Sequence, residues 1–203
     1  MISHKYKFIF IHIPKCAGCS LKEHLVKNSD NKLINSGHES LDVLLKNFSL
    51  KTEDYYKFTF VRNPWDRIVS LYFFWLNQTL DSVFYKWDFK QVNFIKDNNL
   101  SFIDFVKLIP FNDSVFYKKP HLHPYIDYFI GDPTSFNFIG RLENFQQDFN
   151  TICDQIGIPR QELPHKNKSN HKHYTEYYDD ETRQIVAEKY AKDIEYFGYK
   201  FGD

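Results

Sequence analysis

The chain has 203 residues, of which 42% are hydrophobic and 19% aromatic, enough to bury the core of one folded domain. Its 26 basic residues balance 26 acidic ones, and a zero net charge excludes the whole-molecule field that favours nucleic acid or an anionic membrane. No run of 18 apolar residues occurs, so we expect no transmembrane segment.

The first half of the chain predicts strands and helices in alternation. The expected elements, in chain order, are a strand at 8–13, a helix at 19–27, a weaker strand at 32–35, a helix after Ser40, a strand at 56–61 and a helix at 64–76. The first strand is a continuous apolar run, typical of a strand buried on both faces of a parallel sheet. Asn63 as N-cap and Pro64 as first helical residue favour the last of these helices.

The second half gives weaker signals, and residues 77–133 are aromatic-rich and irregular. We expect a helix at 101–109, a strand at 136–139, a helix at 143–156 and a helix at 180–194. We find no internal repeat or interdomain linker, so residues 1–203 are predicted to form a single domain. The expected architecture is a three-layer α/β fold with a mostly parallel central sheet of four to five strands, flanked by helices.

The first chemical signal is a loop between the first strand and its helix, with the sequence Ile13-Pro-Lys-Cys-Ala-Gly-Cys-Ser20. A strand that turns through a glycine into a helix presents backbone N–H groups and the positive end of the helix dipole to an anion. Lys15 adds a cation and Ser20 a hydroxyl. Because the lysine precedes the glycine, the loop is not a Walker A motif.

The second signal joins the strand at 56–61 to the next helix, with the sequence Phe60-Val-Arg-Asn-Pro-Trp-Asp-Arg-Ile-Val-Ser-Leu-Tyr72. Arg62 and Ser70 offer a guanidinium and a hydroxyl to a second phosphate. Arg67 is expected to have a structural role. Two anion loops at the carboxyl edge of one parallel sheet suit a ligand with phosphates at both ends.

These two motifs carry a resemblance to a known family. Pro14-Lys15-x-x-Gly18-x-Ser20-Leu21 resembles the 5′-phosphosulfate loop of sulfotransferases that use 3′-phosphoadenosine-5′-phosphosulfate (PAPS), in particular the carbohydrate branch. The segment from Arg62 to Tyr72 resembles the 3′-phosphate loop of that family. The resemblance extends through residues 139–145, 164–169 and 174–201, and it implies a P-loop-like fold.

By this resemblance, the 5′-phosphosulfate is held by Lys15, Cys16, Ala17, Gly18, Cys19 and Ser20. Arg62 and Ser70 hold the 3′-phosphate, and Lys168 and Ser169 close over the nucleotide. Cys16 and Cys19 depart from the family, which more often has threonine or another small residue there. The expected product is the desulfated nucleotide PAP.

Sulfuryl transfer to a hydroxyl needs a cation at the leaving phosphate oxygen and a base for the acceptor proton. We assign the first role to Lys15 and the second to His38, which follows the second strand and should emerge at the same sheet edge as both loops. Glu39 is the alternative base, followed by His12. The expected acceptor is a hydroxyl of a carbohydrate, as a glycan or a glycolipid, and residues 77–133 are expected to shape its choice.

Other interpretations remain open. Cys16 and Cys19 form a C-x-x-C between a strand and a helix, which is also the pattern of a thiol-disulfide redox protein. A second alternative is a PAP- or nucleotide-binding protein that has lost catalysis. Its histidine pairs lack the spacing of a zinc site, so no metal is expected. Three cysteines are an odd number, which favours a reducing, cytoplasmic location, and the sequence does not indicate the oligomeric state.

Overall fold

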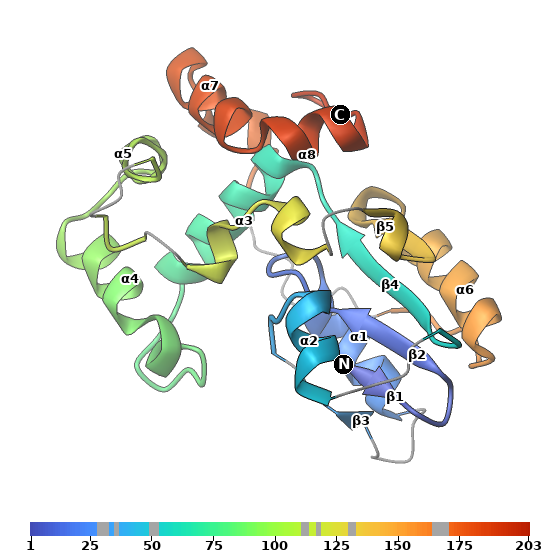
Figure 1. Cartoon of the computed structure of the whole chain (residues 1–203). Coiled ribbons are helices and arrows are strands. Elements are labelled where there is room, and N and C mark those ends of the chain that lie inside the picture. The colour runs from blue at the N-terminus through green and yellow to red at the C-terminus, as the bar shows by residue number, and fades with distance from the viewer. Residues whose placement is uncertain are drawn as a thin grey trace. The chain divides into compact units, whose positions relative to one another are not determined.

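Figure 1 shows the computed structural model of the chain, which describes residues 1–27, 33–34, 37–48, 53–110, 114–116, 119–129, 133–163 and 171–203. The chain divides into two compact units. The first unit comprises Met1–Arg62 and Tyr125–Lys168, and the second comprises Asn63–Pro124 and Ser169–Asp203. Each unit is described by itself.

The first unit is built on a five-stranded sheet in the order β3-β1-β2-β4-β5. Its strands are β1 (Ile2–Ser3), β2 (Phe8–Ile11), β3 (Leu33–Ile34), β4 (Tyr56–Val61) and β5 (Phe138–Arg141). The β2–β4 and β4–β5 pairs are parallel, whereas β1 is antiparallel to both of its neighbours. Four of the five strands thus run in one direction and β1 runs in the other. The predicted mostly parallel α/β sheet is therefore confirmed. The sequence did not reveal β1, because two residues are too few to show an alternating pattern.

The described residues of the first unit also form three α-helices and three short 3₁₀ segments. They are α1 (Gly18–Lys27), α2 (Leu41–Phe48), α6 (Phe145–Ile156), η2 (Tyr125–Tyr128), η3 (Pro133–Ser135) and η4 (Leu142–Asn144). The His24 ring of α1 packs edge-on against Phe149 of α6, with ring centroids 4.9 Å apart. Phe60 of β4 contacts Phe145 of α6 in the same way. These aromatic contacts hold α1 beside α6 and hold α6 against the sheet.

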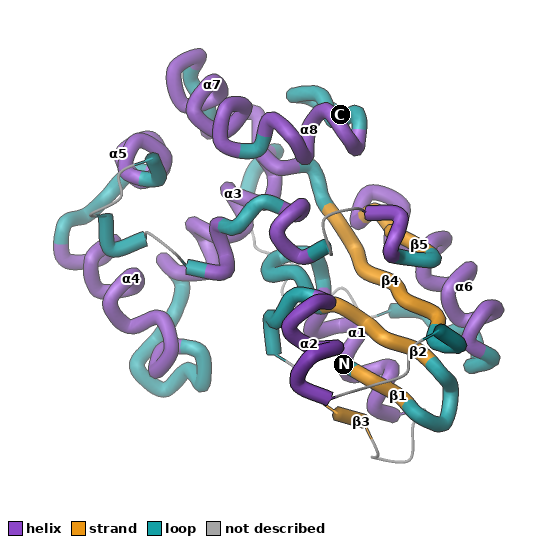
Figure 2. The backbone as a smooth tube through the Cα atoms, viewed as in Figure 1, coloured by secondary structure: helices purple, strands orange, loops and turns teal. Residues whose placement is uncertain are grey.

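The described residues of the second unit contain helices and loops only, as Figure 2 shows. The elements are α3 (Pro64–Leu76), α4 (Tyr85–Asp97), α5 (Phe102–Leu108), η1 (Pro120–Leu122), η5 (Tyr174–Tyr177), α7 (Asp180–Lys189) and α8 (Ala191–Phe197). Helix α3 is central and packs against α4, α5, α7 and η5. Its Trp75 is fully buried and stacks on Phe116, so this unit has a core of its own.

Two features of the second unit differ from the expectation. Helix α4 was not predicted, because its pattern is irregular: Asp88 and Gln91 are buried beside Val92 and Ile95, while Trp87 is 80% exposed. The helix expected at 180–194 is interrupted at Tyr190, which leaves helical geometry with φ −110° and ψ 24°. Its hydroxyl donates to the carbonyl oxygen of Leu122 at 3.0 Å, so a tertiary contact accompanies the break.

Candidate functional site

Both predicted anion loops begin at the same edge of the first unit's sheet. Strands β2 and β4 are parallel neighbours in a register that places Ile11 beside Thr59. Lys15 lies four residues beyond the end of β2, and Arg62 directly follows β4. Because parallel strands present their carboxyl ends at one edge, the two loops leave the sheet on the same side.

The backbone of the first loop has a conformation suited to an anion. Lys15 and Ala17 have positive φ angles of 67° and 57°, a left-handed geometry that costs non-glycine residues about 1–2 kcal/mol each. Left-handed residues inside a turn make concave arrays of N–H groups that bind anions. Helix α1 begins at Gly18, and the N–H groups of Gly18 and Cys19 precede any acceptor within the helix. The N–H of Ser20 already donates to the Ala17 carbonyl oxygen at 3.1 Å. The loop therefore fits a phosphate or sulfate group.

The two cysteines of this loop have opposite environments. The Cys16 side chain is 1% exposed, and its thiol donates to the hydroxyl oxygen of Tyr125 at 4.0 Å. Cys19 is exposed and Ser20 is buried. A ligand outside the loop would thus meet the backbone of Cys16, because the thiol is directed into the protein.

Tyr125 connects the first loop to Arg62. Its side chain is fully buried, and its hydroxyl donates to the backbone carbonyl oxygen of Arg62 at 2.6 Å. Sequence reasoning missed this residue because Tyr125 lies in the irregular segment 77–133, whose contacts are distant in sequence. No local pattern could have identified it.

Gly18 is required by a neighbouring side chain. A Cβ atom at this position would lie 1.8 Å from Cδ2 of His12, far inside van der Waals contact. The His12 ring is itself buried, at 8% exposure. His12 was the third candidate for the base, but its ring packs against the start of α1, which favours a supporting role.

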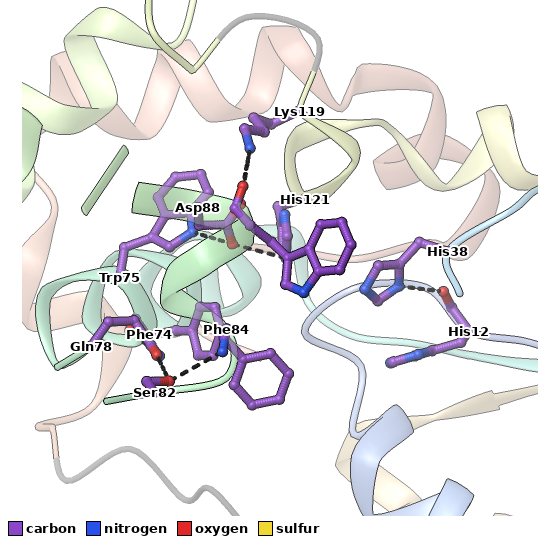
Figure 3. A network of polar contacts seen from close by, with 11 residues as sticks. His12, His38, Phe74, Trp75, Gln78, Ser82, Phe84, Asp88, Lys119 and His121 are labelled. Atoms are coloured by element: carbon purple, nitrogen blue, oxygen red, sulfur yellow. Dashed lines mark hydrogen bonds and ion pairs between the residues drawn. The ribbon is translucent and has the colours of Figure 1, made fainter. Parts of the chain in front are cut away.

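His38 lies against His12 in the same unit, as Figure 3 shows. Its Nδ1 is 3.1 Å from the carbonyl oxygen of His12, and the two ring centroids are 4.4 Å apart. Because a carbonyl oxygen only accepts, Nδ1 carries the proton, and the neutral ring has its lone pair on Nε2. Glu39, the alternative base, accepts instead from Nδ2 of Asn47 at 3.4 Å.

Ser70 and the residues around it belong to the second unit. Asn63 caps α3 as predicted, accepting from the backbone N–H of Trp65 at 3.1 Å. Ser70 is buried in α3, at 6% exposure. Arg67 is also fully buried and donates to the carbonyl oxygen of His123 at 2.8 Å, which is a structural contact. Lys168 and Ser169 lie outside the described residues.

A buried carboxylate organises part of the second unit (Figure 3). Asp88 accepts from the Trp75 indole N–H and from the Lys119 ammonium, each at 3.0 Å. His121 lies 3.8 Å from the same carboxylate. Lys119 and His121 thus both lie against Asp88. In the part of the chain that the structure describes, no group of His, Cys, Asp and Glu could hold a metal ion, and no helix is long and apolar enough to cross a bilayer.

Comparisons with known proteins give a consistent result. The sequence model of the sulfotransferase family matches residues 1–200. An uncharacterized protein of Archaeoglobus fulgidus is 30% identical over 109 residues, which cover 54% of this chain and 73% of that protein. The crystal structure of mouse sulfotransferase SULT7A1 complexed with PAP is similar in fold, with a TM-score of 0.51 and 13% identity over 95% of this chain and 85% of that one.

Proposed function

The chain belongs to the sulfotransferase family, and we propose that it transfers the sulfuryl group of PAPS to a hydroxyl of a carbohydrate, as a glycan or a glycolipid. The observation that carries this proposal is the common origin of the loops around Lys15 and Arg62 at one edge of the β2–β4 pair. The family match spans nearly the whole chain and favours a single sulfotransferase domain over 1–203.

We assign the nucleotide contacts to the two anion loops. Residues 15–20 would hold the 5′-phosphosulfate, with the backbone N–H groups of Gly18 and Cys19, the Lys15 ammonium and the Ser20 hydroxyl as donors. The N–H groups of Cys16 and Ser20 already donate to the carbonyl oxygens of Ile13 and Ala17. Arg62 and Ser70 would hold the 3′-phosphate, and Lys168 with Ser169 would close over the nucleotide. PAPS supplies an activated sulfuryl group. As the bond between this group and the 5′-phosphate breaks, Lys15 would stabilise the negative charge that develops on the phosphate oxygen.

His38 is the proposed base. Its hydrogen bond to the carbonyl oxygen of His12 fixes the ring and places the lone pair of the neutral imidazole on Nε2. That atom would accept the proton of the acceptor hydroxyl as the hydroxyl attacks sulfur. A positioned base of this kind contributes roughly 10²–10⁴ in rate. We also propose a cytoplasmic location, on the odd number of cysteines.

The test is transfer of radiolabelled sulfate from PAPS to a panel of glycans, glycolipids and small alcohols, followed by separation of the labelled product. We expect label in a carbohydrate acceptor and none with Lys15→Ala. Label in small alcohols alone would contradict the carbohydrate assignment. Tight PAP binding without transfer to any acceptor would instead identify a nucleotide-binding protein that lacks catalysis.

A further inference from the structure

Tyr125 makes hydrogen bonds to both loops at once. Its hydroxyl donates to the carbonyl oxygen of Arg62 at 2.6 Å and accepts from the thiol of Cys16 at 4.0 Å. We propose, on the basis of the function above, that Tyr125 is a positioning residue that couples the 5′-phosphosulfate loop to the 3′-phosphate loop. Through it, Arg62 at the start of the second loop is held relative to Cys16 in the first loop.

The environment of Tyr125 makes these contacts costly to break. The side chain is fully buried, as is that of Cys16, so water cannot replace a lost partner. The 2.6 Å separation is at the short end for a hydroxyl donor to a carbonyl oxygen. Loss of the Tyr125 hydroxyl would remove this donor from the carbonyl oxygen of the half-buried Arg62.

The two hydrogen bonds of Tyr125 each restrain the backbone of one loop. Cys16 stands between Lys15 and Ala17, the two left-handed residues of the first loop, so its thiol contact fixes the direction in which this turn faces. The Arg62 carbonyl group is bonded to the Cα atom that carries the arginine side chain. A hydrogen bond that holds this carbonyl therefore restrains the position from which the side chain starts. Tyr125 itself belongs to η2, a separate segment of the first unit, so it can hold one loop relative to the other.

The contact with Tyr125 also explains why a cysteine can stand at position 16, where the family more often has threonine or another small residue. A thiol or hydroxyl that is directed inward at this position can donate a hydrogen bond to Tyr125. A group that is directed outward could instead contact the ligand. We therefore expect Cys16→Ser to preserve the coupling, because a hydroxyl also donates. Cys16→Ala should weaken the coupling.

The test uses Tyr125→Phe in the full chain and three nucleotides, titrated by calorimetry. PAP occupies both loops, whereas adenosine 5′-monophosphate and adenosine 3′-monophosphate each occupy one. A ligand with one phosphate tolerates a small displacement between the loops, but PAP does not. We expect the PAP dissociation constant to rise about 10-fold, as for loss of one buried hydrogen bond. Each monophosphate should change by less than about threefold.

Tyr55→Phe is the matched control, because it also removes the hydroxyl of a buried tyrosine with a hydrogen-bond partner, the Nδ1 of His4 at 2.6 Å. Tyr55 directly precedes β4, at the end of the strand opposite to Arg62. This variant should bind PAP like the wild type. Equal weakening of all three nucleotides by Tyr125→Phe would indicate general destabilisation and overturn the proposal. The proposal would also be wrong if the affinities for PAP and for adenosine 3′-monophosphate fell equally while the affinity for adenosine 5′-monophosphate stayed the same. Tyr125 would then support only Arg62.

An unchanged PAP affinity in Tyr125→Phe would also refute the coupling while leaving the proposed function intact. A wild-type chain that binds no PAP would refute the proposed function itself, and the coupling with it. The two failures are therefore distinguished by the wild-type titration.

Discussion

The Nδ1 atom of His38 donates to the backbone carbonyl oxygen of His12 at 3.1 Å, and the His12 ring in turn occupies the space beside Gly18. Three residues from three segments are thus in contact at the start of α1. The glycine admits the His12 ring, and the His12 backbone orients His38. The proposed base is in this way linked structurally to the loop that is proposed to hold the 5′-phosphosulfate.

Replacing His38 should separate catalysis from nucleotide binding. In His38→Ala we expect PAP affinity within about twofold of the wild type and turnover reduced roughly 10²–10⁴-fold, because only the proton acceptor is lost. Calorimetry with PAP and a radiolabel transfer assay measure the two quantities. Glu39→Gln is the companion variant and should remain active. Full activity of His38→Ala combined with an inactive Glu39→Gln would transfer the base to Glu39.

Gly18→Ala should disturb the first loop through His12. The added methyl group would lie 1.8 Å from Cδ2 of His12, so either the ring or the loop must move. We expect PAP affinity to fall at least about 10-fold in this variant, because the phosphate-binding backbone is displaced. The double variant Gly18→Ala/His12→Ala should recover part of the loss, since the obstructing ring is gone. Without any recovery, the steric explanation would be wrong.

The three thiols should differ in reactivity. Cys19 is exposed, whereas Cys16 and Cys153 are buried. Burial, together with the nearby Asp154 carboxylate, raises the pKa of Cys153 to about 11. Below that pH the native thiol stays protonated, so its reaction with a thiol reagent should increase as pH rises from 8 towards 11.

In the native chain at pH 8 we expect one rapidly reacting thiol, lost in Cys19→Ser, and three after denaturation. This outcome also bears on the redox alternative, which needs a Cys16 and a Cys19 that exchange with disulfides. Rapid modification of two thiols, with formation of a Cys16–Cys19 disulfide under mild oxidant, would favour that alternative.

Asp88 should matter for stability. Its buried carboxylate accepts from Trp75 and Lys119, so Asp88→Ala leaves an indole N–H and an ammonium without this partner. Breaking a buried charge pair by removing one member typically costs about 3–5 kcal/mol, and partial exposure of Lys119 places the expected loss of unfolding free energy near the lower value. Urea denaturation followed by tryptophan fluorescence measures it. Asp97→Ala, at an exposed position of the same helix, should change the free energy of unfolding by less than about 0.5 kcal/mol. An equal loss of stability in Asp88→Ala and Asp97→Ala would contradict the structural role assigned to Asp88.

Local signals predicted the parts of the fold that lie next to the anion loops. The strand at Tyr56–Val61 and the helix at Pro64–Leu76 match their expected bounds, because an apolar run, an asparagine cap and a proline at the first helical position act within a few residues. The support of Gly18 by His12 could not be predicted in this way, because the motif shows the glycine but not the ring that requires it.

Contacts between segments that are distant in sequence could likewise not be predicted. Tyr125 is 63 residues from Arg62 and 109 from Cys16, and nothing in its surroundings distinguishes it from other aromatic residues of the middle segment. Helix α4 was missed for a related reason, since its polar Asp88 is turned inward by partners outside the helix.

The loops around Lys15 and Arg62 are proposed to bind opposite ends of one nucleotide, and calorimetric titration with PAP measures that binding. The wild type should bind PAP, and Lys15→Ala and Arg62→Ala should each raise the dissociation constant on the order of 10- to 100-fold, as expected for loss of a charged hydrogen bond. Lys46→Ala, which removes an exposed lysine of α2 paired with Asp42, should bind like the wild type. Retained PAP affinity in Arg62→Ala would contradict the account.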